Sequence, residues 1–226
     1  MADPGGCVPA QVRILAYDIE VSPNTGYTWR VREQDVLKVI EPWYILCFAY
    51  TWVGEEDEVH VVALPDFRKQ YKQDPTNDYQ VVKKLHELFE AADIVVGHNS
   101  QSYDNRRANA RFAVHNIPPP RPYKSIDTCL VARKYFDFNS NKLGDLGETL
   151  GCGSKAETGG FNLWVRAMAG QKAAWDTFRQ YCMQDVVLLR AIYLKLRPWI
   201  DGHPNVSFLN GTLENCPKCG CRSWRT

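Results

Sequence analysis

The stretch VRILAYDIE, residues 12–20, is a mostly apolar run that ends in two acids. Its apolar and β-branched residues predict a buried strand. Residues two apart on a strand point to the same face, so Asp18 and Glu20 stand side by side. Two carboxylates this close repel each other, and a bound cation relieves that repulsion. A strand that simply runs out into solvent is the alternative, and this pair alone leaves both interpretations open.

The segments that follow predict an α/β domain. Further strands are expected at 27–31, 43–53, 59–63, 93–97 and 125–128, and helices at 78–92, 105–115, 129–136, 142–150 and 173–199. Because strands come first and helix–strand alternation follows, we expect a mixed sheet with helices on both faces. This domain would occupy residues 1–200 and leave residues 201–226 as a tail with its own chemistry.

Composition and charge are those of an ordinary folded protein. The 226 residues are 45% hydrophobic and 23% charged, which excludes disorder as the main state. The net charge is +1, so any affinity for a polyanion must come from local patches. The apolar run 43–53 is shorter than the roughly 20 residues that span a bilayer. Since residues 1–6 lack the pattern of a secretory signal, we expect a cytoplasmic protein that is not secreted and has no membrane partner.

Further acids lie at two other places in the chain. Asp104 follows the predicted strand 93–97, and ligands gather at the carboxyl ends of strands in open α/β sheets. It is also suited to cap the helix that follows. Tyr181 and Asp185 are four residues apart in a predicted helix and share one face. The alternative for this pair is a core tyrosine beside a surface acid, although Asp185 borders the very apolar segment 186–189.

Together these residues resemble the DEDD exonuclease superfamily, the DnaQ-like branch of the ribonuclease H-like fold. The resemblance covers residues 10–200 and comprises three motifs in order, namely Asp18 with Glu20, Asn99 with Tyr103 and Asp104, and Tyr181 with Asp185. The tyrosine in the third motif is typical of the DEDDy subclass, shared with proofreading domains of DNA polymerases. The resemblance implies an α/β, ribonuclease H-like mixed sheet flanked by helices.

The resemblance also implies a two-metal-ion reaction on phosphodiester bonds. Two ions about 3.5–4 Å apart activate water and stabilise the leaving oxygen, and Mg²⁺ or Mn²⁺ prefer oxygen ligands. Asp18, Glu20 and Asp185 would hold one ion, and Asp18 and Asp104 the second. Tyr181 would orient the attacking water, because a phenol with a pKa of about 10 is a poor base at neutral pH.

A basic region adjoins the second motif. Between Asn105 and Lys134 there are seven Lys and Arg residues and one acid, Asp127, which favours a track for phosphates over a merely solvated helix face. Asp127 itself resembles an accessory position of bacterial and phage relatives, and the expected location is the cytoplasm of a bacterial or phage-infected cell. The candidate nucleic-acid contacts are Asn99, Tyr103, Arg106, Arg107, Arg111 and Lys124.

The last cysteines form a separate motif. Cys216, Cys219 and Cys221 include a Cys-x-x-Cys-Gly turn that looks like half of a zinc ribbon. A full ribbon needs four ligands, so a truncated or degenerate knuckle is favoured over an intact Zn²⁺ site, unless a remote ligand such as His203 completes it. The other, scattered cysteines are typical of free thiols rather than of a disulfide framework.

The sequence therefore predicts a metal-dependent 3′→5′ exonuclease that acts on single-stranded DNA, alone or in trans with a replication or repair protein. An exoribonuclease is the alternative, since no reader of the 2′-OH can be identified. An endonuclease on branched or hybrid substrates is another. A non-catalytic nucleic-acid-binding protein on a decayed nuclease fold is disfavoured, because all four acids and the tyrosine are present.

Overall fold

A five-stranded mixed sheet forms the centre of the computed structural model, which describes residues 11–32, 35–54, 58–156, 159–210 and 216. The strand order is β5-β4-β1-β6-β7. The strands span β1 Ile14–Val21, β4 Ile45–Trp52, β5 His60–Ala63, β6 Ile94–Gly97 and β7 Lys124–Asp127. β1 is antiparallel to β4 and parallel to β6, and β6 is parallel to β7.

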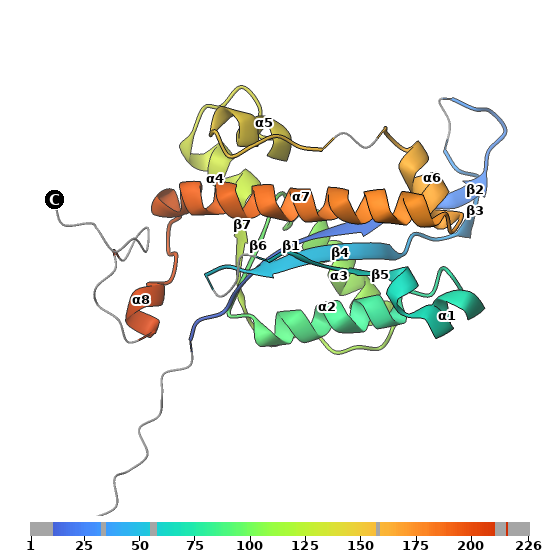
Figure 1. Ribbon diagram of the computed structural model, residues 1–226, viewed down its shortest axis with the longest axis horizontal. Helices are drawn as coiled ribbons and strands as arrows, with labels where there is room; N and C mark the ends of the chain where they lie inside the picture. The colour runs from blue at the N-terminus through green and yellow to red at the C-terminus, as the bar shows by residue number, and fades with distance from the viewer. Residues whose placement is uncertain (1–10, 33–34, 55–57, 157–158, 211–215, 217–226) are drawn as a thin grey trace, which may run out of the picture.

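Helices pack on both faces of this sheet (Figure 1). The long helix α7 lies along one face, together with α4, α5 and α6, while α2 and α3 lie on the other. Their bounds are α1 Arg68–Gln73, α2 Tyr79–Ala91, α3 Asp104–Val114, α4 Thr128–Tyr135, α5 Leu143–Thr149, α6 Asn162–Met168 and α7 Lys172–Leu196. The predicted α/β architecture, a mixed sheet flanked by helices, is confirmed.

Side-chain alternation along β1 decides where its acids point. Tyr17 faces α2, where its ring meets the ring of Phe89 edge-on at 5.0 Å. Ile14 is on the opposite face, in the buried cluster that α7 closes. Asp18 and Glu20 are an even number of residues from Ile14, so they point toward α7 as well.

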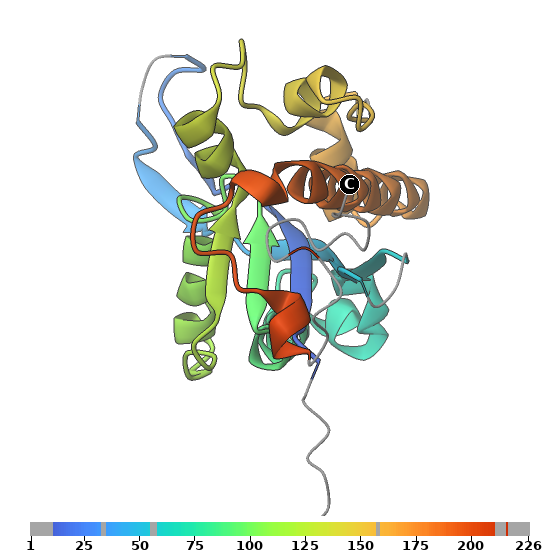
Figure 2. The ribbon, with the colours of Figure 1, turned by 90° about the vertical axis from the view of Figure 1, so that its left-hand side faces the viewer.

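The structure contains elements that the sequence patterns do not predict. Strand β3, Lys38–Glu41, pairs with β2, Thr25–Tyr27, as a separate two-stranded sheet that stands apart from the main sheet (Figure 2). The strand expected at 27–31 shares only its first residue with β2. Both strands are largely exposed, so neither carries the alternation of apolar and polar residues that marks a half-buried strand. Helices α1 and α6 are also additional, and both are short.

The chain folds back onto the domain after α7. A short helix, α8 Val206–Leu209, lies beside the start of β1 (Figure 2). The side-chain oxygen of Asn210 accepts a 2.7 Å hydrogen bond from the amide of Val12. The His203 ring bonds to the Tyr193 hydroxyl through one nitrogen, at 2.6 Å, and to a backbone carbonyl through the other.

Cys216 is described as a half-buried free thiol, whereas Cys219 and Cys221 lie outside the described residues. The separate tail and its zinc ligands therefore stay predictions. Among the helices of the described residues, none combines the length and the apolar character that a membrane span requires.

Candidate active site

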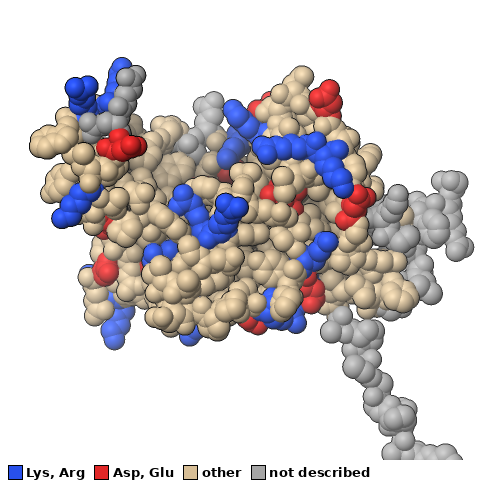
Figure 3. Space-filling view, turned by 180° about the vertical axis from the view of Figure 1, so that it is seen from behind, with Lys and Arg blue, Asp and Glu red and all other residues tan. Residues whose placement is uncertain are grey.

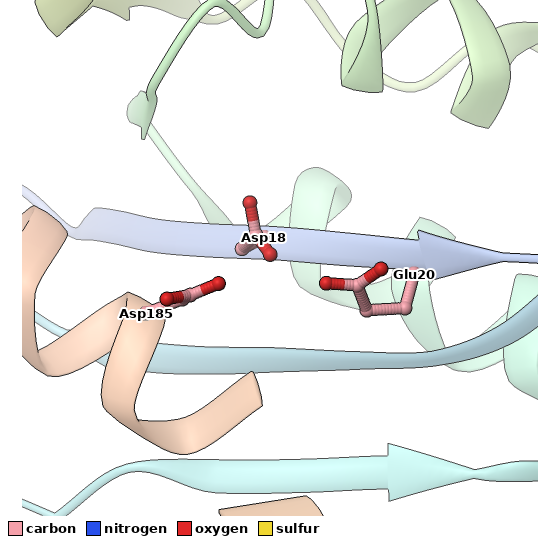
Figure 4. Close-up of side chains that lie close together, drawn as sticks. All are labelled: Asp18, Glu20 and Asp185. Carbon is pink, nitrogen blue, oxygen red and sulfur yellow. The ribbon is translucent and has the colours of Figure 1, made fainter. Parts of the chain in front are cut away.

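Three carboxylates converge where the end of β1 passes α7 (Figure 4). Asp18 and Glu20 come from β1 and Asp185 comes from the middle of α7. One oxygen from each lies within 4.8 Å of the other two. Figure 4 shows the three side chains directed into the same space between strand and helix. The even spacing on β1 and the buried face of α7 thus bring together acids that are far apart in the chain.

Asp104 lies next to this cluster. It is the first residue of α3 and is buried, and its carboxylate accepts a long hydrogen bond, 3.4 Å, from the amide of Ile19. It is not part of the three-carboxylate cluster. All four acids nevertheless line a single cavity of about 580 Å³.

Burial raises the pKa of each of these acids. The pKa of Glu20 rises to about 8, through burial and then the charge of Asp185. The pKa of Asp104 rises to about 6, mainly through burial. The pKa of Asp18 lies well above its usual value, through burial and then Asp104. A divalent cation would lower all of these pKa values, because it stabilises the ionised carboxylates.

A lysine contacts the cluster from a loop. Lys155 Nζ lies 2.9 Å from Oδ2 of Asp185. Burial raises the pKa of Asp185, and the positive charge of Lys155 partly offsets this rise. The other oxygen of Asp185 is buried and has no hydrogen-bond partner. Leaving such an oxygen unpaired costs about 1–3 kcal/mol. An unpartnered oxygen in an all-oxygen donor set fits a hard divalent cation such as Mg²⁺ or Mn²⁺.

Tyr181 precedes Asp185 by one turn of α7 and is partly buried. It does not line the cavity of the acids; it lines a neighbouring hollow of about 370 Å³ that Lys155 shares. Lys155 Nζ lies 4.9 Å from the centre of its ring. Burial, and then the charges of Glu20 and Asp185, raise the pKa of Tyr181 far above its ordinary value. The phenol therefore keeps its proton at neutral pH, which suits hydrogen bonding better than proton abstraction.

Asp127 fixes the loop between β6 and α3. Its carboxylate accepts hydrogen bonds from the amides of Asn99 at 2.8 Å and Gln101 at 3.1 Å. It also caps α4 by accepting from the amide of Cys129 at 3.0 Å. Asn99 adopts a positive φ of 57°, which Asn tolerates better than most residues. Asp127 thus holds the backbone that presents Asn99 to the cavity.

The structure brings some of the predicted nucleic-acid contacts to the cavity. Asn99 and Tyr103 line it, and the guanidinium of Arg107 lies 4.4 Å from the centre of the Tyr103 ring. Arg106 is exposed on α3 and is not among the lining residues.

Two other basic residues are placed away from the acids. Arg111 donates to the carboxylate of Asp78, which is fully buried. Lys124 begins β7, at the end of the strand opposite to Asp127. The cavity is also lined by polar and basic groups that the sequence motifs do not include, among them Arg133, residues 139–142 and Lys155. No spacing rule marks these residues, because they lie at the end of a helix and in two loops.

Comparisons with known proteins agree with this fold. The family model of the RNase_H superfamily matches residues 41–197. The structure is similar to that of a family B DNA polymerase from the hyperthermophilic archaeon Pyrobaculum calidifontis, with a TM-score of 0.62 and 16% sequence identity. The match covers 88% of this chain and 27% of that chain. At this identity the likeness shows the fold alone. No curated protein matches the sequence.

Proposed function

The chain belongs to the RNase H superfamily, and from this premise we propose that it is a metal-dependent nuclease of the DEDDy type that removes nucleotides from the 3′ end of a single strand, with DNA favoured over RNA. The observation that carries the proposal is the partly buried cluster of Asp18, Glu20 and Asp185, with one oxygen of Asp185 left unpartnered. Structural ion pairs do not explain three acids at one point with a single lysine beside them.

Each acid has a defined place in the proposal. Asp18, Glu20 and Asp185 would hold one divalent ion, and Asp18 with Asp104 a second. Two such ions, when bound, lower the pKa of water and stabilise charge on the oxygens of the scissile phosphate. The cluster consists of carboxylates alone, which favours Mg²⁺ or Mn²⁺ over Zn²⁺.

The other residues around the cavity would bind and orient the substrate. Protonated Tyr181 can hold the attacking water by a hydrogen bond while Lys155 keeps the phenol and Asp185 in place. Asn99, on the loop that Asp127 fixes, is placed to contact the terminal nucleotide. Tyr103 offers a partly exposed ring at the rim, on which a base can stack.

Product analysis on matched substrates tests this proposal. Single strands of DNA and RNA with one sequence and a 5′ label are incubated with Mg²⁺, Mn²⁺ or a chelator, beside copies whose 3′ end carries an inverted nucleotide. We expect a metal-dependent ladder of products that shorten from the free 3′ end, faster for DNA, and no products from the blocked strands. Internal cleavage of the blocked strands would replace the exonuclease with an endonuclease. Binding without cleavage in every metal would refute catalysis.

A further inference from the structure

A second hollow lies near the carboxylate cavity and shares no lining residue with it. Its volume is about 450 Å³, and it opens where the chain enters β4, where α2 begins and where α3 ends. Trp43, Tyr44 and Tyr79 provide its aromatic groups, and Thr76 and Asn77 provide polar groups. The proposed reaction uses none of these residues.

Stacked side chains connect the two hollows. Tyr103 lines the carboxylate cavity and Trp43 lines the second hollow. The guanidinium of Arg107 lies between them, 4.4 Å from the centre of the Tyr103 ring and 4.5 Å from that of Trp43. Among the described residues, no carboxylate forms an ion pair with Arg107. Its charge is therefore available to a phosphate that passes over Tyr103, Arg107 and Trp43, which together form a ridge between the hollows.

The second hollow is lined by two basic residues, which share one buried partner, and by two acids, Glu41 and Asp74. Arg111 and His115 both bond to the carboxylate of Asp78, the latter at 2.6 Å. Asp78 also accepts a 2.8 Å hydrogen bond from the amide of Ile45, and its side chain is fully buried. This network holds α3, β4 and the start of α2 together and leaves no free positive charge for a phosphate. The aromatic rings and amides above it suit a flat base with polar edges.

We propose that this hollow is a second nucleotide subsite, which takes an unpaired base upstream of the 3′ end while Arg107 contacts the phosphate backbone between the two hollows. The inference rests on the proposed function, because it assumes that the strand end occupies the carboxylate cavity. It adds to that function a minimum length of substrate: the single strand must be long enough to span both hollows. A base in a duplex does not present the free faces that Trp43 and Tyr79 require.

Lys and Arg side chains are prominent on the face of the molecule that is seen from behind (Figure 3). Figure 3, which views the molecule from behind Figure 1, shows Lys and Arg side chains spread over the middle of that face, with fewer Asp and Glu among them. Aromatic side chains alternate with cations along the ridge itself, the arrangement by which single strands are bound without a sequence requirement.

Scanning a strand with abasic residues tests the subsite without any need for cleavage. A 5′-fluorescent ten-nucleotide DNA with one abasic residue, moved along the strand, is bound to the full chain in the presence of a chelator and followed by fluorescence anisotropy. For the wild-type chain we expect one internal position, apart from the 3′-terminal ones, at which base loss weakens binding at least about fivefold, the lower range for one stacked base. In Trp43→Ala that sensitivity should disappear, and Trp43→Phe should restore it.

Trp199→Ala is the matched control, since Trp199 is half exposed and lines a different hollow; it should keep the wild-type profile. An internal position equally sensitive in Trp43→Ala, or no sensitive internal position, would overturn the subsite. An unfolded chain would lose its sensitivity at every position, so Trp43→Ala counts only if it keeps the wild-type sensitivity at the 3′-terminal positions and a cooperative thermal transition. If the wild-type chain shows the sensitive internal position but cleaves no substrate, the proposed nuclease activity is refuted and the subsite is supported. If it cleaves the strand but shows no sensitive internal position, the subsite is refuted and the nuclease activity is supported.

Discussion

Replacing Glu20 by Gln should stabilise the metal-free protein at alkaline pH. Burial and the charge of Asp185 raise the pKa of Glu20 from 4.5 to about 8 in the folded chain. Between these values the folded state binds more protons than the unfolded state, so the free energy of unfolding falls as the pH rises. Gln is neutral at every pH, so the free energy of unfolding of Glu20→Gln does not include this fall with rising pH.

The expected size follows from the same two pKa values. Linkage between pH 5.5 and pH 8 amounts to about 3 kcal/mol for this one group. For a domain of this size that corresponds to roughly 6–10 °C in Tm. In the presence of a chelator, Glu20→Gln should therefore melt well above the wild-type chain at pH 8, and the gap should narrow strongly at pH 5.5.

Thermal unfolding followed by calorimetry at both pH values checks this prediction. Glu87→Gln is the control, because Glu87 is half exposed and paired with Lys84 on the surface of α2; its Tm should differ from wild type by the same small amount at both pH values. If the Tm of Glu20→Gln does not exceed that of the wild-type chain at pH 8, or exceeds it equally at both pH values, the raised pKa of Glu20 is refuted.

Three further outcomes follow from the structure. Asp185→Ala should abolish metal-dependent cleavage, whereas Tyr181→Phe should slow it and leave a measurable single-turnover rate, because the tyrosine orients water and does not hold a metal. Mn²⁺ should bind more tightly at pH 8 than at pH 6 and release protons, since it ionises acids whose pKa values are raised; calorimetry in two buffers of different ionisation enthalpy measures both effects. Asp78→Ala should lower the free energy of unfolding, measured with urea, by about 3–5 kcal/mol, because it leaves Arg111 and His115 without their buried partner.

The local patterns of the sequence predict the acidic cluster well. Asp18 and Glu20 lie two apart on a strand whose other residues are apolar, and Tyr181 and Asp185 lie four apart on a helix. These periodicities determine which face a residue occupies. The long or strongly apolar elements that position these residues, β1, β4, β6 and α7, are for the same reason close to their predicted bounds.

Such local patterns do not predict contacts between segments that are distant in the sequence. Lys155 lies in a loop that carries no periodicity, and only the fold brings it to Asp185. Arg111 belongs to a basic stretch of sequence, yet its charge is held by Asp78, a residue of another segment. A local count of charges cannot reveal a tertiary partner, just as it cannot reveal that Trp43 and Arg107 stack.

The most direct test of the carboxylate site is the rate of 3′-end cleavage by Asp18→Asn. This substitution keeps the size of the side chain, and far-UV circular dichroism and Tm establish that the variant is folded. With Mg²⁺ and a 5′-labelled single strand, the wild-type chain should produce a ladder of shortened products and the folded variant should produce none above the chelator background. A folded Asp18→Asn chain that cleaves at the wild-type rate would contradict the assignment of these acids as the metal-binding catalytic site.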